Sequence, residues 1–158
     1  MKSITMKNKE ILTLTKQLTE IKDKNLGKSI KFQYAVLTNL RKVFTLKSEL
    51  IEESKVSRLK QFESDKQELT IKYALKDDSG KAIVSQNENG QFVTIPEDNK
   101  PLLNKEMIEL FEKYSGTLNE VELFLNTNDE FEVHDIDVGD CEGIDIKTMD
   151  AIYPLLKE

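Results

Sequence analysis

Hydrophobic residues recur at helical spacing through the N-terminal half of the chain. Residues 8–22 repeat apolar side chains at intervals of three and four, which predicts one amphipathic helix. Asn8 is the expected N-cap of this helix, and the Asp-, Asn- and Gly-containing stretch 23–27 is the expected break after it. The apolar stripe consists of Ile11, Leu14, Leu18 and Ile21.

The next stretch, residues 30–76, contains no Gly and no Pro and follows Ser29, a candidate N-cap. Ile30, Leu37 and Phe44 are spaced by seven residues, which is typical of a helix that packs against another helix. We therefore predict a helical hairpin with a much longer second arm. These three side chains are expected to contact the short helix.

The distal part of this long helix carries apolar residues that the short helix is too short to cover. The two helices would measure about 22 Å and about 70 Å at 1.5 Å per residue. Ile51, Leu59 and Phe62 should therefore contact either the C-terminal lobe or a second chain, which leaves a homo-oligomer open. The stretches 54–60 and 64–66 are the expected places for any break in the helix.

The C-terminal half shows shorter elements of mixed type. Short β-type runs at 82–84 and 92–95 flank a turn at Asn89-Gly90, which predicts a β-hairpin with a loop longer than the minimum. A helix is expected over 104–114, with Asn104 as its cap and Ser115-Gly116 at its end.

Alternating apolar and polar residues follow at 121–125 and again at 131–138, which predicts a second strand pair joined by 126–130. Asp145 should cap a last helix that Pro154 ends or kinks. The predicted fold class is therefore α+β. It consists of a helical hairpin at 1–76 and a small lobe at 77–158 with a β-hairpin, a second strand pair and two helices.

Charge divides the chain in the same way. Residues 1–76 hold 17 Lys and Arg against 9 Asp and Glu, and residues 77–158 hold 6 against 20, so the net charges are +8 and −14. The basic half does not favour nucleic acid as a partner, because Arg is scarce and no recognition motif is present. The acidic half leaves open a protein that imitates the phosphates of nucleic acid.

Composition narrows the cellular setting. The single cysteine, Cys141, excludes an internal disulfide and favours a reducing compartment. No apolar run approaches the roughly 20 residues that a membrane span needs, and no signal-peptide pattern opens the chain. We expect a cytoplasmic protein with no membrane partner.

Candidate chemistry is sparse. The acidic stretch 135–140 begins like a calcium loop, but Gly139 and Ile146 fall where an EF-hand needs other residues. His134 and Cys141 match no zinc spacing, and no strand–turn–helix context supports a Cys–His nucleophile. The sequence therefore predicts no catalytic residue, metal or cofactor, and no enzyme.

Several segments resemble a family of small tailed-bacteriophage proteins of unknown function. The segments are MKNKEI at 6–11, KFQYAVLTNLR at 31–41 and KYALKDDSGK at 72–81, followed by a C-terminal strand pair closed by a helix. The resemblance covers nearly the whole chain and transfers no site residue. It implies a phage or prophage origin and a non-enzymatic role.

Together these observations predict a phage-encoded interaction or assembly factor that binds a phage or host protein in the bacterial cytosol. The alternative is an inhibitor of a host nucleic-acid-binding or defence protein that acts through the acidic lobe. The residues expected to contact the partner are Asp135, Asp137, Asp140, Glu142, Ile51, Leu59 and Phe62.

Overall fold

A two-stranded antiparallel sheet joins the N-terminus to the C-terminal third of the chain. Strand β1 (Lys2–Lys7) pairs with β4 (Asn128–Val133), with Lys2 opposite Val133 and Lys7 opposite Asn128. This pairing differs from the predicted one, in which 131–138 paired with 121–125. Residues 2–7 alternate inward and outward side chains, and Met6 is buried.

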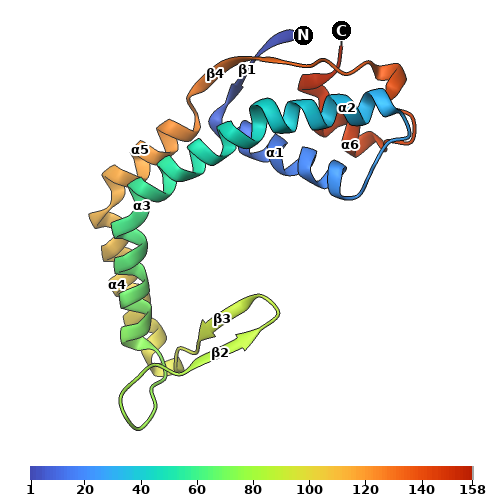
Figure 1. Ribbon diagram of the computed structural model, residues 1–158. Coiled ribbons are helices and arrows are strands. Elements are labelled where there is room, and N and C mark those ends of the chain that lie inside the picture. Colours follow the sequence, from blue (N-terminus) through green and yellow to red (C-terminus); the bar gives the residue numbers. More distant parts are fainter. Residues whose placement is uncertain (158) are drawn as a thin grey trace. The chain divides into compact units, whose positions relative to one another are not determined.

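The computed structural model describes residues 1–157 and divides the α+β chain into two units. Unit 1 combines Met1–Lys55 with the residues from Glu122 onward, and unit 2 is Val56–Val121. The α+β class and the helical hairpin are confirmed (Figure 1). The expected division at 76/77 does not coincide with these units, because β4 returns to pair with the N-terminal strand.

Three helical segments form the hairpin of unit 1 and continue beyond it. They are α1 (Asn8–Asp23), α2 (Ile30–Asn39) and η1, a π-helical turn (Leu40–Phe44), from which α3 (Thr45–Tyr73) continues. The helical chain is therefore irregular at η1 rather than at 54–60 or 64–66. A π-turn inserts one extra residue per turn and so rotates the faces on either side of it.

Of the two caps predicted for the helical hairpin, one is confirmed. The Ser29 hydroxyl accepts a hydrogen bond from the Phe32 N–H, as expected of an N-cap. Lys7 rather than Asn8 is the N-cap of α1. Asn8 is the first helical residue, and its buried side-chain amide donates to the Phe124 carbonyl at 2.8 Å.

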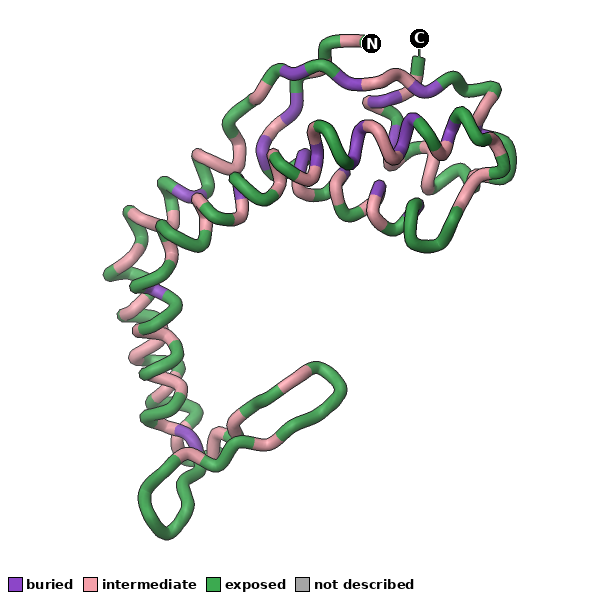
Figure 2. The backbone as a smooth tube through the Cα atoms, in the orientation of Figure 1, coloured by how far each residue is buried: buried purple, intermediate pink, exposed green. Residues whose placement is uncertain are grey.

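One hydrophobic core fills unit 1 (Figure 2). Phe44 is fully buried, as predicted, and its ring meets the edge of Phe131 with centroids 5.6 Å apart. The prediction for Ile30 was wrong, because its side chain is 83 % exposed at the first position of α2. The largest fully buried apolar side chains are Phe32, Phe44, Ile11, Leu14, Leu18, Ile136, Ile152, Leu155, Val36 and Val133.

The C-terminal segment of unit 1 closes this core with short elements. They are η3 (Val138–Asp140), α6 (Ile146–Ala151) and η4 (Tyr153–Leu155). Asp145 caps α6 as predicted and accepts from the Thr148 N–H at 2.8 Å. The helix ends at Ala151, three residues before Pro154.

Unit 2 contains the C-terminal part of α3, a β-hairpin and two further helices. The predicted hairpin is confirmed as β2 (Val84–Asn87) and β3 (Gly90–Val93). Its loop is the two-residue minimum, shorter than expected, because Asn87 pairs with Gly90 at φ 113°. The 3₁₀ turn η2 (Glu97–Asn99) then leads into α4 (Lys100–Lys113) and α5 (Ser115–Leu125).

Two expectations for this region were wrong. The helix α4 begins at Lys100 rather than after Asn104, with Pro101 in its first turn, where the missing N–H of proline does no harm. Residues 121–125 are helical and not a strand. Their apolar residues alternate over too few positions to distinguish the two periods, since Leu118, Val121 and Leu125 are also spaced by three and four.

The two units differ in how much apolar surface they bury. Of the residues that the structure describes in unit 2, only Phe62, Ala74 and Val121 are buried apolar side chains, whereas the core of unit 1 contains seventeen. Unit 2 is held mainly by partly buried contacts between α3 and α4 and by hydrogen bonds at the base of the hairpin.

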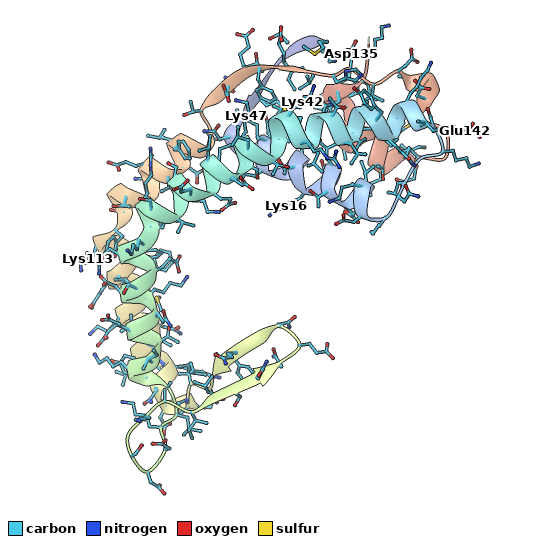
Figure 3. All side chains as sticks on the ribbon, in the orientation of Figure 1. Lys16, Lys42, Lys47, Lys113, Asp135 and Glu142 are labelled. Carbon is cyan, nitrogen blue, oxygen red and sulfur yellow. The ribbon has the colours of Figure 1, made fainter. Side chains whose placement is uncertain are left out.

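Folding redistributes the charge that the sequence separates. Unit 1 draws 12 basic and 6 acidic residues from 1–55 and 2 basic and 11 acidic residues from 122–158, a net charge of −3. Unit 2 holds 9 basic and 12 acidic residues and also carries −3. Basic Lys16, Lys42 and Lys47 thus share one unit with acidic Asp135 and Glu142 (Figure 3).

Candidate functional site

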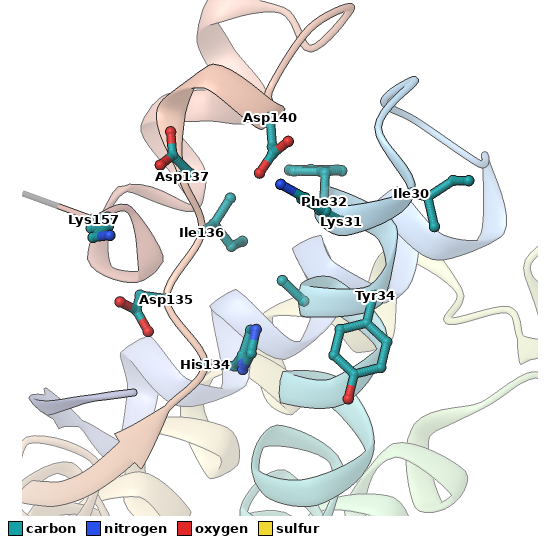
Figure 4. Close-up of a pocket in the computed structure, with 11 residues that line it drawn as sticks. Ile30, Lys31, Phe32, Tyr34, His134, Asp135, Ile136, Asp137, Asp140 and Lys157 are labelled. Atoms are coloured by element: carbon teal, nitrogen blue, oxygen red, sulfur yellow. The ribbon is translucent and has the colours of Figure 1, made fainter.

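A cleft of about 410 Å³ lies in unit 1 between the start of α2 and the segment that follows β4. Figure 4 shows three carboxylates along that segment, with Tyr34 and His134 at one end of the cleft. The cleft is therefore built from parts of the chain about 100 residues apart. It is lined by Ile30, Lys31, Phe32, Tyr34, Ala35, His134, Asp135, Ile136, Asp137, Asp140 and Lys157.

Backbone contacts hold both walls in place. The Ser29 cap starts α2 at the cleft, and the Asn39 side chain bonds the backbone of His134 at the far end of the helix. Ile136 pairs with the C-terminal tail, because its N–H donates to the Leu155 carbonyl and its carbonyl accepts from the Lys157 N–H, both at 2.8 Å. These bonds join the backbone at His134 to α2 and the backbone at Ile136 to the C-terminal tail.

Three of the four predicted acidic residues line this cleft: Asp135, Asp137 and Asp140. Asp135 forms an ion pair of 2.8 Å with the N-terminal amino group, and this hydrogen bond lowers the pKa of the Asp135 carboxyl. Asp137 caps η3 by accepting from the Gly139 N–H, and Asp140 accepts from the Ser29 hydroxyl at 3.0 Å.

Glu142, the fourth predicted acid, does not line the cleft. Its carboxylate lies 3.5 Å from the Lys28 ammonium, and both side chains are about three-quarters exposed. Such an exposed pair contributes little to stability. The acidic set is thus divided between the cleft and an exposed loop.

The apolar residues predicted for the partner surface are placed differently. Ile51 is buried in the core of unit 1, and Phe62 is buried in unit 2 against the rings of Phe111 and Tyr114. Neither side chain is available to a partner, so this part of the prediction was wrong. Phe62 instead makes the other predicted contact, which is with the C-terminal half of the chain. Leu59 is half-buried in α3.

Sequence reasoning missed the aromatic and apolar part of the cleft. Tyr34 is 60 % exposed, and its ring meets His134 edge-on with centroids 5.7 Å apart and an interplanar angle of 83°. Ile30 and Tyr34 lie four residues apart and therefore share one helix face. That spacing was visible in the sequence as a second stripe beside the one that packs on α1.

The two residues considered for catalysis have separate partners. His134 packs on Tyr34, whereas the buried Cys141 thiol donates to the Asp137 carbonyl at 3.6 Å. Burial, with the nearby charges of Asp140 and Asp137, raises the pKa of the Cys141 thiol. Burial and a raised pKa both keep a thiol in its unreactive protonated form.

Metal binding finds no support among residues 1–157. No group of three or more His, Cys, Asp or Glu side chains in this part of the chain is placed to hold a metal ion. The carboxylates at 135–140 instead accept hydrogen bonds from three different donors of the same chain.

Three carboxylates of the acidic C-terminal segment are paired with basic groups from the N-terminal part of unit 1. Asp129 pairs with Lys47, Asp135 pairs with the N-terminal amino group and Glu142 pairs with Lys28. The basic N-terminal half thus supplies counter-charges to the acidic C-terminal segment within unit 1. Phosphate mimicry requires a field that these pairs reduce.

The cleft places hydrogen-bond acceptors beside exposed apolar surface. A carboxylate has about four acceptor positions, so Asp135, Asp137 and Asp140 retain acceptor positions beyond the bonds that they form within the chain. The exposed Tyr34 ring and Ile30 provide apolar surface beside them. An aromatic face next to carboxylates suits a side chain that is apolar along its stem and basic at its end.

No family model, curated protein or solved structure matches this chain. Among the described residues, no helix combines the length and apolar character that crossing a membrane requires.

Proposed function

We propose that this protein acts without catalysis, as an interaction factor whose unit 1 cleft receives a segment of another protein. The segment would present a basic side chain to the carboxylates and an apolar side chain to Ile30 and Tyr34. The resemblance noted above implies that the partner is a phage or bacterial host protein, met in the host cytosol. A phage origin is part of this proposal.

One observation carries the proposal: Ile30 and Tyr34 remain exposed in the same cleft as Asp137 and Asp140, whose carboxylates accept hydrogen bonds from the Gly139 N–H and the Ser29 hydroxyl. An exposed aromatic ring in a preformed cleft is typical of binding hot spots. Preformed geometry also reduces the entropy that binding would otherwise lose. Neither Ile30 nor Tyr34 belongs to the hydrophobic core of unit 1.

The test begins with capture of partners from a bacterial lysate on the immobilised full-length chain. Each captured protein is purified, and its affinity is measured for wild type, Tyr34→Ala and Tyr153→Ala. Tyr153 is a matched control, because it is 70 % exposed in unit 1 but lies outside the cleft. We expect Tyr34→Ala to weaken binding at least about tenfold and Tyr153→Ala to leave it unchanged.

A second pair of variants tests the carboxylates. Asp137→Asn removes one charge and keeps an oxygen that can accept from the Gly139 N–H, so the local fold is retained. Asp150→Asn removes an exposed charge of α6 outside the cleft. If both aspartate variants, or both tyrosine variants, behave alike with every captured protein, the cleft is not the binding site.

A further inference from the structure

The helix α4 has an apolar face that unit 2 leaves uncovered. None of its residues is buried, although it carries six large apolar side chains from Leu102 to Phe111. Ile108 is 61 % exposed, and Phe111 is 45 % exposed in spite of its contact with Phe62. Exposed apolar residues grouped on one helix face mark an interaction surface more often than single ones do.

One flank of α4 is already joined to α3 by polar contacts. Glu106 accepts from the Lys72 ammonium at 2.9 Å and from the Tyr73 hydroxyl at 2.7 Å. Seven residues further along, Lys113 lies 3.4 Å from Asp65, which also accepts from the Tyr114 hydroxyl. The charged pair Glu106 and Lys113 is therefore satisfied within the chain.

A second charged pair with the same spacing lies about 100° around the helix from the first. Lys105 and Glu112 are also seven residues apart, and both are exposed. Among the described residues, neither forms an ion pair within 4.0 Å. At 100° per residue, Lys105, Ile108 and Glu112 fall within an arc of about 60°.

We propose that this face of α4 binds the same face of α4 in a second copy of the chain, with the two helices antiparallel. Ile108 of each copy then packs against Phe111 of the other. In that register Lys105 lies opposite Glu112 of the second copy, twice, as flanking positions do in antiparallel coiled coils. A parallel arrangement would instead place Lys105 and Glu112 beside the other flank of the second helix, where Met107 and Tyr114 lie, so neither charge would meet an opposite one.

Self-association of this kind follows from the charge pattern and does not depend on the unit 1 cleft. A two-fold axis between the helices repeats every contact, so each complementary pair counts twice. Along α4 the order is Lys105, Ile108, Phe111, Glu112. A second copy of this helix presents complementary charges to it only when the second helix runs in the opposite direction. This order selects a second copy in preference to an unrelated apolar partner.

Sedimentation equilibrium of the full-length chain across the micromolar range tests the proposal. We expect a reversible monomer–dimer equilibrium for wild type. Ile108→Ser should weaken association at least about a hundredfold, because two apolar side chains lose their contact. Leu102→Ser is the matched control, since Leu102 is 52 % exposed on the same helix but about 120° from Ile108.

A charge exchange tests the antiparallel register itself. Lys105→Glu and Glu112→Lys should each weaken association about tenfold, because each variant places like charges opposite each other. The double variant restores opposite charges and should associate like wild type. An equimolar mixture of the two single variants should form heterodimers for the same reason. Circular dichroism confirms that each variant is folded.

Three results would overturn the proposal. They are a wild-type chain that stays monomeric throughout, a dimer that is as sensitive to Leu102→Ser as to Ile108→Ser, and a double variant no better than either single one. Tyr34→Ala, which removes an aromatic side chain from the unit 1 cleft, should leave the monomer–dimer equilibrium unchanged. This variant therefore separates the inference from the proposed function.

Discussion

The side-chain amide of Asn39 pairs with the backbone of His134 as a neighbouring strand would. Its Nδ2 donates to the His134 carbonyl, and its Oδ1 accepts from the His134 N–H, both at 2.7 Å. Asn39 is 1 % exposed and lies 95 residues away in the chain. These two hydrogen bonds hold α2 against the segment that follows β4, and these are the two walls of the cleft.

Replacing Asn39 by Ala should destabilise unit 1 by about 2–4 kcal/mol, because both backbone groups of His134 lose their partner. Urea unfolding followed by circular dichroism measures the change. Asn119→Ala, at an exposed position of α5, is the control and should stay within about 0.5 kcal/mol of wild type. Equal effects of the two variants would show that the Asn39 bonds contribute nothing specific.

Phe44→Ala should cost about 3–5 kcal/mol, the usual range for removing a fully buried aromatic side chain. Phe131 would lose its edge-to-face partner, and the π-helical turn η1, which ends at Phe44, would border a cavity. Phe92→Ala should cost less than about 1 kcal/mol, because Phe92 is 44 % exposed in the hairpin. A loss below 1 kcal/mol for Phe44→Ala in a denaturant melt would contradict its place in the core.

The Cys141 thiol should react slowly in the native protein, because it is buried and its pKa is raised. With an aromatic disulfide reagent at pH 8, we expect a rate at least about a hundredfold below that of the urea-unfolded chain. Ser57→Cys adds a thiol at an exposed position of α3 and should produce one fast phase beside the slow one. Two equally fast phases would show that Cys141 is accessible.

The ion pair between Asp135 and the N-terminal amino group predicts a dependence of stability on acid pH. The pKa of Asp135 is lower in the folded protein than in the unfolded chain, where a typical value is about 3.9. Its contribution is therefore present above that value and is lost as the pH falls through the folded pKa.

Wild type and Asp135→Asn should differ in urea midpoint near pH 6, and the difference should shrink steadily below pH 4. Comparing the two chains at each pH removes the contributions of other carboxylates, such as the capping Asp145, whose pKa is also lowered by its bonds to Thr148. A difference that is independent of pH would mean that the carboxylate charge does not stabilise the folded state.

For partner binding, the structure separates the four acidic residues that the sequence grouped together. Glu142→Gln should leave the affinity for a captured partner unchanged, because Glu142 lies outside the cleft. The triple change of Asp135, Asp137 and Asp140 to Asn should weaken binding and slow association most, since long-range attraction acts before contact. Asn is chosen over Lys because Asp137 and Asp140 also accept structural hydrogen bonds. A Glu142 effect equal to that of the triple variant would place the interface on the exposed loop.

The sequence alone determined those elements that depend on residues close together in the chain. The apolar stripe of α1, the cap at Ser29, the turn at Gly90 and the cap at Asp145 were all predicted, because each depends on residues within a few positions. Helical spacing and capping need no distant partner. The same reasoning failed at 121–125, where a window of five residues fits both periods.

Only the tertiary structure decided which distant segments meet. Strand β1 gains its partner β4 from more than 120 residues away, and no local pattern announces such a pairing. The return of the C-terminal segment to the N-terminal strand cancels the charge separation of the sequence, buries Ile51 and brings Asp135, Asp137 and Asp140 to the face of α2 that exposes Tyr34. The residue types of the cleft were therefore present in the sequence, but their proximity arises from long-range packing that a one-dimensional pattern does not contain.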